Sequence, residues 1–143
     1  SQHTFTEIQF LKYYNTMARN FHNLEVWKLG YELALDFYKM TAEFPEDEKN
    51  NITSQIRRAA VSVPLNIAEG STRFTKKGYL QFLNYAYGSV RELEVLLLLC
   101  SGLNYINEKD FRNFYEKIDK LSKKLFVFIN KVKNEEFYDW YRS

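Results

Sequence analysis

Apolar residues recur at spacings of three and four along four successive stretches of this 143-residue chain. The spacing follows the 3.6-residue period of an α-helix and predicts helices at about 24–42, from between 47 and 53 to 69, 78–101 and 107–133. The last stretch carries an unbroken heptad seam from Phe111 to Val132. Five Gly and two Pro are too few for the tight turns of a β-rich fold. The short joints favour an all-α, antiparallel up-down-up-down four-helix bundle.

Capping residues mark the ends of these helices. The expected N-caps are Asn23, Asn51 or Thr53, Thr75, and Asn107 with Asp110 three residues on. Gly70 and Gly102 are expected to end the second and third helices, because glycine readily adopts the left-handed conformation of a C-cap. Pro64 falls inside the second helix and removes one backbone donor there, so we expect a kink.

Two segments flank the expected bundle. The sequence divides into an N-terminal extension at 1–20, the bundle at 21–134 and an acidic-aromatic tail at 135–143. Apolar residues from Phe5 to Phe21 have amphipathic spacing, which predicts an extra helical segment. The tail combines Glu and Asp with Phe, Tyr and Trp, and it either folds back on the bundle or docks on a neighbour.

Three helices carry more apolar residues than one buried face requires, and in the first of them these are Val26, Leu33, Phe37 and Met40. In the third helix these are Val95, Leu96, Leu98 and Leu99, and in the fourth they are Phe126, Val127 and Ile129. A helix that is apolar all round has to be covered all round. A monomeric four-helix bundle does not cover it, so we expect a homo-oligomer.

The composition also excludes several classes of function. One cysteine and two histidines allow no internal disulfide and no zinc site of His and Cys ligands within one chain. No apolar run approaches the ~20 residues that span a bilayer, and the N-terminus lacks a signal-peptide pattern. Phosphate-loop, dinucleotide-binding and hydrolase motifs are missing. We therefore expect a cytoplasmic protein without a cofactor or metal, and no sequence motif points to a particular enzyme class.

Basic residues are the best candidates for contacts with a nucleic acid. The set is Arg57, Arg58, Arg73, Lys76 and Lys77. Guanidinium and ammonium groups neutralise backbone phosphates irrespective of base sequence. With a net charge of only +2, the alternative is a solvated helix face. Phe74, between Arg73 and Lys76, either stacks on a base or anchors the turn to the bundle.

A second basic series follows the last helix and is a secondary candidate. It consists of Lys117, Lys120, Lys123, Lys124, Lys131 and Lys133. The simpler interpretation is that these lysines keep the outer face of the helix soluble while their stems cover apolar surface.

Ser62, Asn66 and Glu69 form a polar stripe on the second helix. A catalytic interpretation requires a base near Ser62, and neither histidine is close in sequence. A structural role is favoured, in which Ser62 or Asn66 serves a carbonyl group freed by Pro64.

Four stretches agree with one known family. They are FHNLEVWK at 21–28, Phe44-Pro45 with Glu48, TSQIRRAAVSVPLNIAEG at 53–70 and AYGSVRELE at 86–94. The chain resembles, over 21–133, the four-helix-bundle family of the protein encoded in intervening sequences of bacterial 23S ribosomal RNA genes. That family also contains the accessory variability determinant of diversity-generating retroelements. The sequence departs from the usual pattern in its long N-terminal extension and in the bulky Leu65.

The resemblance implies a bacterial, non-enzymatic bundle that assembles as a homopentameric ring and binds nucleic acid, with RNA favoured over DNA. The retroelement member binds RNA and a reverse transcriptase through basic surfaces. We therefore expect a nucleic-acid-binding scaffold. The alternative is a protein-interaction adaptor, for example the accessory subunit of a retroelement reverse transcriptase.

Overall fold

The computed structural model describes residues 7–9 and 21–135. Its long helices are α2 (Glu25–Thr41), α3 (Ile52–Ser71), α4 (Lys76–Gly102) and α5 (Glu108–Lys133). Two 3-10 turns, η1 (Phe21–Asn23) and η2 (Glu46–Glu48), precede α2 and α3, and the described ranges contain no strand. The expected all-α class is confirmed. Of the N-terminal extension, residues 7–9 are helical; its remainder and residues 136–143 of the tail lie outside the described residues.

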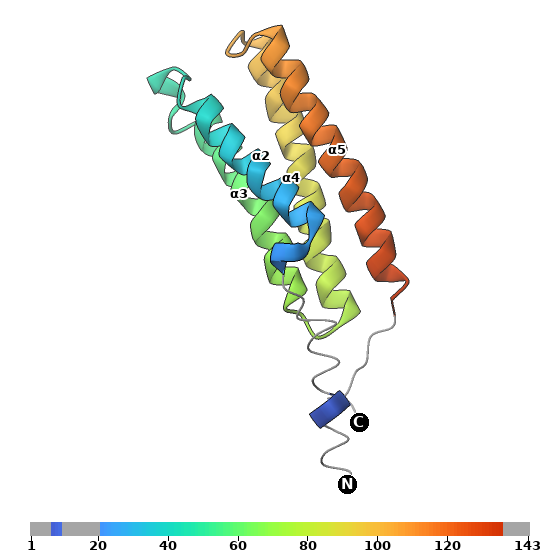
Figure 1. Ribbon diagram of the computed structural model, residues 1–143. Coiled ribbons are helices and arrows are strands. Elements are labelled where there is room, and N and C mark those ends of the chain that lie inside the picture. The colour runs from blue at the N-terminus through green and yellow to red at the C-terminus, as the bar shows by residue number, and fades with distance from the viewer. Residues whose placement is uncertain (1–6, 10–20, 136–143) are drawn as a thin grey trace.

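Successive helices run antiparallel in one elongated bundle (Figure 1). The α2–α3 and α4–α5 connections lie at the same end, which we call the apical end. The α3–α4 turn lies at the opposite, basal end, where α5 also finishes. Helix α3 packs against α2 and α4, and α4 packs against α5, whereas α2 and α5 touch over a shorter stretch.

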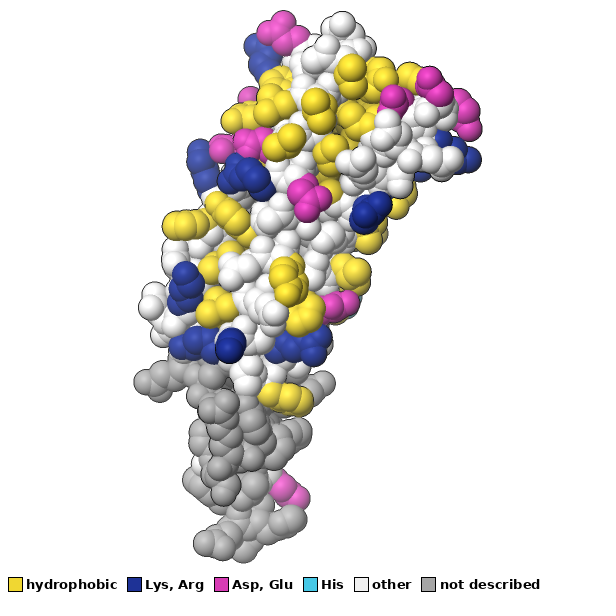
Figure 2. Space-filling model, turned by 180° about the vertical axis from the view of Figure 1, so that it is seen from behind, with side chains coloured by type: hydrophobic (Ala, Val, Ile, Leu, Met, Phe, Trp, Pro, Cys, Tyr) yellow, Lys and Arg dark blue, Asp and Glu magenta, His cyan; other side chains and the backbone are white. Residues whose placement is uncertain are grey.

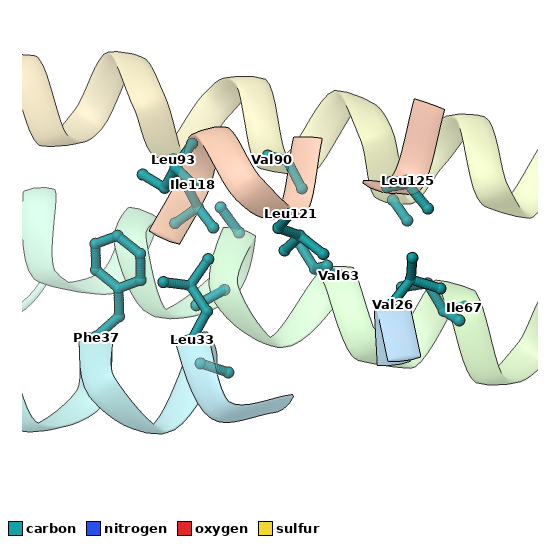
Figure 3. Packing of buried hydrophobic residues seen from close by; sticks show 14 of the residues in the cluster. Val26, Leu33, Phe37, Val63, Ile67, Val90, Leu93, Ile118, Leu121 and Leu125 are labelled. Carbon is teal, nitrogen blue, oxygen red and sulfur yellow. The ribbon is translucent and has the colours of Figure 1, made fainter. Parts of the chain in front are cut away.

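The core lies along the bundle axis, because the three-and-four spacing turns one face of every long helix inward. Figure 3 shows side chains of all four helices pointing toward one another, among them Phe37, Val63, Leu93 and Leu121. Each buried side chain of this size contributes about 1.5–3 kcal/mol by leaving water. Phe37 also meets the ring of Phe114 at 4.8 Å between centroids, which joins α2 to α5.

The caps follow the sequence in part. Thr75 Oγ1 accepts a hydrogen bond from the Gly78 amide at 3.0 Å, and Asn107 Oδ1 accepts one from the Asp110 amide at 2.7 Å. Both predictions are confirmed. Asn23 is not the cap of α2, because the chain forms η1 there and Leu24 takes the N-cap position. Asn51 does precede α3, but its side-chain amide donates to Glu48 Oε2 at 3.2 Å instead of capping.

Neither glycine ends its helix in the expected way. Gly70 lies inside α3, where an added Cβ would come within 3.0 Å of Phe82 Cβ, so it permits close approach of α3 and α4. Gly102 is the last residue of α4, and Asn104 has the left-handed conformation at φ 61°. The Tyr105 amide donates to the Cys100 carbonyl at 2.9 Å and the Asn104 amide to Ser101 at 3.1 Å, the pattern of a Schellman motif.

Candidate nucleic-acid interface

The five predicted phosphate-binding residues fall into two groups. Arg57 and Arg58 lie in the apical half of α3, whereas Arg73, Lys76 and Lys77 lie at the basal turn between α3 and α4. Ser71 lies fourteen positions after Arg57 in α3, which is roughly 20 Å at a rise of 1.5 Å per residue. The structure therefore offers two cationic surfaces and not a single one.

Arg57 is already engaged within the bundle. Its Nε donates to Thr41 Oγ1 at 2.9 Å and its terminal nitrogen to the Tyr38 carbonyl at 3.4 Å. Its guanidinium also lies 4.7 Å from the centre of the Tyr38 ring. A cation at the end of α2 complements the negative end of the helix dipole. Arg57 thus has a structural role that its sequence position does not reveal.

A shallow groove of about 560 Å³ runs beside Arg57 and Arg58, and we call it the α3 groove. Lys49, Arg57 and Arg58 line it with positive charge, and the exposed side chains of Val61 and Leu65 make it partly apolar. Arg58 is exposed, and its side chain forms no hydrogen bond or ion pair with any residue that the structure describes. This groove can take an anionic group, with Arg58 the more available of the two arginines.

The basal end gathers cations from two parts of the chain. Arg73 is exposed and its guanidinium lies 4.3 Å from the centre of the Phe82 ring, while Lys77 is exposed nearby. Lys76 Nζ donates to the Lys133 carbonyl at 2.8 Å, which brings the α3–α4 turn to the end of α5. The basal cluster, as we name it, consists of Arg73, Lys76, Lys77, Lys131 and Lys133. Phe74 is half-exposed in the same turn.

Charge is unevenly distributed between the two ends of the bundle. Figure 2 shows a row of Lys and Arg side chains across the basal end, with most acidic side chains towards the apical end. The apical acids include Glu43, Glu46, Asp47, Glu48, Glu108 and Asp110. The net charge of +2 is therefore unevenly distributed, and the positive potential is concentrated at the basal end.

In the sequence alone, Lys131 and Lys133 belong to the second basic series, whose simpler interpretation is solvation of the outer helix face. Nothing in the linear sequence links them to Arg73, because the antiparallel path of α4 and α5 is what brings the two segments together. The rest of that series partly fits the simpler interpretation. Lys117 pairs with Asp36 at 2.7 Å, Lys123 with Asp119 at 2.8 Å and Lys124 with Glu25 at 3.0 Å.

The polar stripe of α3 joins two helices. Ser62 Oγ and Ser89 Oγ share a hydrogen bond of 2.7 Å, and Asn66 Nδ2 donates to both the carbonyl and the Oγ of Ser62 at 2.8 Å. The carbonyl that Asn66 serves belongs to Ser62 and not to Ala60, whose helical donor Pro64 removes. Ser62 is therefore held by neutral partners, which favours the structural role.

Two further observations concern chemistry. The described residues hold no group of three or more His, Cys, Asp or Glu side chains placed to bind a metal ion. Burial, with a smaller contribution from Glu48, raises the pKa of the Cys100 thiol to about 11. The thiol therefore stays protonated, and hence poorly nucleophilic, at neutral pH.

No helix within the described ranges is long and apolar enough to cross a membrane.

Together these features define a four-helix-bundle protein with a cationic end. The chain belongs to the 23S rRNA-intervening sequence protein family, whose model matches residues 22–127. This family is the one that the sequence motifs resemble.

A solved structure supports the fold. A protein of unknown function from the S23 ribosomal protein family of Bacteroides thetaiotaomicron superposes with a TM-score of 0.68 at 22% sequence identity. The match covers 73% of this chain and 95% of that protein. At this identity the likeness shows the fold alone. Comparison with curated proteins gave no significant match.

Proposed function

We propose that the protein is a non-catalytic, homo-oligomeric scaffold that binds nucleic acid, with RNA as the preferred ligand. The observation that carries the proposal is the basal cluster, in which Lys76 bridges two cationic segments that are far apart in sequence. Every nucleotide of RNA carries a negatively charged phosphate, which a cationic surface of this kind neutralises. The preference for RNA over DNA rests on the resemblance to this family, whose retroelement member binds RNA.

The side chains of the basal cluster differ in how accessible they are to a phosphate group. Arg73 is held over the Phe82 ring, which leaves the edge of its guanidinium open to a phosphate. Lys77 and Lys131 are exposed at the surface. Arg57 and Arg58 form a secondary contact through the α3 groove, and Arg57 is the weaker of the two because α2 already occupies its donors.

The apical half of α4 supports association of copies. Val95, Leu98, Leu99 and Leu103 are each about half exposed. Figure 2 shows hydrophobic side chains gathered near the apical end of this face. Burial of such a patch stabilises a complex, and a homopentameric ring is the assembly we propose. Five copies of a chain of net charge +2 carry +10, so weak cationic surfaces act together.

A charge-reversal pair tests the proposed function. The double variant Lys77→Glu/Lys131→Glu is expected to weaken binding of a structured RNA and to lower the salt slope of the affinity by about 1 to 2. The control is Lys39→Glu/Lys109→Glu, which makes the same charge change at exposed apical lysines. An equal loss in both variants would mean that net charge, and not the basal cluster, governs binding. Light scattering with and without RNA gives the subunit number.

The amphipathic spacing of the N-terminal extension favours a second candidate function, an adaptor that binds a protein. The accessory subunit of a retroelement reverse transcriptase is one example. For this candidate, removal of residues 1–20 is expected to abolish binding of the partner while the mass of the oligomer, corrected for the deletion, stays the same. A partner that binds the truncated chain equally well would exclude the extension as the adaptor surface.

A further inference from the structure

A groove of about 340 Å³ lies between the start of α2 and the last turns of α5. Its lining includes Val26, Val127, Phe128, Lys123, Lys124 and Lys131. Val26 is buried and Phe128 half-buried, so the floor is apolar. Val127 is 66% exposed, the highest value for a large hydrophobic residue in the described part of the chain. Val26, Val127 and Phe128 thus give the groove a continuous apolar lining, which is typical of a site that another segment covers.

The rim of this groove is basic. Lys124 pairs with Glu25 across the groove at 3.0 Å, and Lys123 pairs with Asp119 on its own helix at 2.8 Å. Lys131 is exposed, and its side chain forms no ion pair or hydrogen bond with any of the described residues. A segment that fills the groove therefore combines apolar or aromatic side chains with acidic ones.

We propose that the groove is the docking site of this chain's own acidic-aromatic tail, residues 135–143. The tail carries three acidic residues and one arginine, together with Phe137, Tyr138, Trp140 and Tyr141. Aromatic side chains of this kind cover apolar floors well, and their acidic neighbours complement the lysine rim. The N-terminal extension lacks this complementarity, because Glu7 is its one acid beside Lys12 and Arg19.

The tail also has the reach that docking requires. Helix α5 ends at Lys133, so Val127 lies about 9 Å and Lys123 about 15 Å back along the helix axis at 1.5 Å per residue. Nine residues in an extended conformation span up to about 30 Å. The tail can therefore reverse direction after Asn134 and lie along the groove. Lys131 belongs to both the rim of the groove and the basal cluster, so docking of the tail and binding of nucleic acid share this side chain.

Tryptophan fluorescence of the full chain tests the docking. The protein has two tryptophans, Trp27 and Trp140, so Trp27→Phe leaves the tail residue as the one reporter. In this background Trp140 is expected to emit at short wavelength and to resist quenching by acrylamide. Adding Val127→Asp is expected to raise the quenching constant roughly threefold, because the docked aromatic side chain is released to water.

The matched control is Phe126→Asp in the same background. Phe126 is 56% exposed on the neighbouring face of α5 and does not line the groove, so this change should leave quenching as it was. Equal effects of the two substitutions, or a Trp140 that is fully accessible before either, would overturn the proposal. Circular dichroism checks that each variant keeps its helices. If Trp140 lost its protection from acrylamide when the protein is diluted, the proposal would also be overturned. The groove would then bind the tail of another copy.

Discussion

Lys76, at the start of α4, donates a hydrogen bond from Nζ to the backbone carbonyl of Lys133, the last residue of α5, at 2.8 Å. This one contact caps a helix end and fixes the basal cluster. The terminal carbonyl groups of α5 have no helical donors, and a cation placed there also complements the helix dipole.

Replacing Lys76 with Met is expected to lower the free energy of unfolding by about 0.5–1.5 kcal/mol, because the carbonyl loses a charged donor while the apolar stem is kept. Urea denaturation measures the change. Lys77→Met is the control, since the side chain of this exposed neighbour forms no hydrogen bond or ion pair with the described residues of α5. A loss of the same size in the control would show that the bond to Lys133 contributes nothing.

Replacing Gly70 and Gly88 with alanine should change the free energy of unfolding in opposite directions. An alanine Cβ at 70 would lie 3.0 Å from Phe82 Cβ and 3.1 Å from the Tyr79 ring, so we expect a loss of about 1–3 kcal/mol from overpacking. At 88 nothing lies within 4 Å, and alanine should stabilise α4 by about 0.5–1 kcal/mol through its higher helix propensity. Thermal unfolding of both variants checks the prediction. A stabilised Gly70→Ala variant would contradict the close approach of α3 and α4.

Arg57→Ala is expected to destabilise the fold by about 1–2 kcal/mol, because it removes the hydrogen bonds to Thr41 and Tyr38 and the contact with the Tyr38 ring. Arg58→Ala should stay within about 0.5 kcal/mol of the parent protein, as is usual at exposed positions. Denaturant unfolding of the two variants separates them. If Arg58→Ala were the more damaging, the assignment of the structural role to Arg57 would be wrong.

The Cys100 thiol makes stability depend on pH in alkaline solution. Its pKa in the folded chain is about 11, above the ordinary value of 9.0 that it takes when unfolded. Between these values the unfolded state releases a proton that the folded state keeps, so stability falls as pH rises. The fall from this group should reach about 2–3 kcal/mol by pH 11 and be absent below pH 8.

Comparison with Cys100→Ala isolates this contribution from that of the tyrosines, which titrate in both proteins. The parent protein should lose more stability than the variant between pH 8.5 and 11, measured by urea denaturation. Parallel curves for the two proteins would exclude the thiol as the cause.

Most of the fold was predictable from local pattern. The three-and-four spacing located all four long helices, and Thr75 and Asn107 were identified as caps because their side chains act within their own turn. The predicted capping roles of Asn23 and Gly70 are wrong for the opposite reason. Their conformations depend on neighbours, namely the turn η1 for Asn23 and the packing of Phe82 for Gly70.

The candidate site, like the fold, was predictable from the sequence only in part. The sequence by itself determined the all-α class, the membership of the family and the identity of the cationic residues, because periodicity and residue type are properties of the chain alone. Only the tertiary structure decided that Arg57 is occupied by α2 and that Lys131 and Lys133 join Arg73 and Lys76. The hydrogen bond between Lys76 and Lys133 alone joins residues 57 positions apart. These relationships arise because antiparallel packing buries the apolar faces of α2 to α5, and that packing sets which helix ends meet.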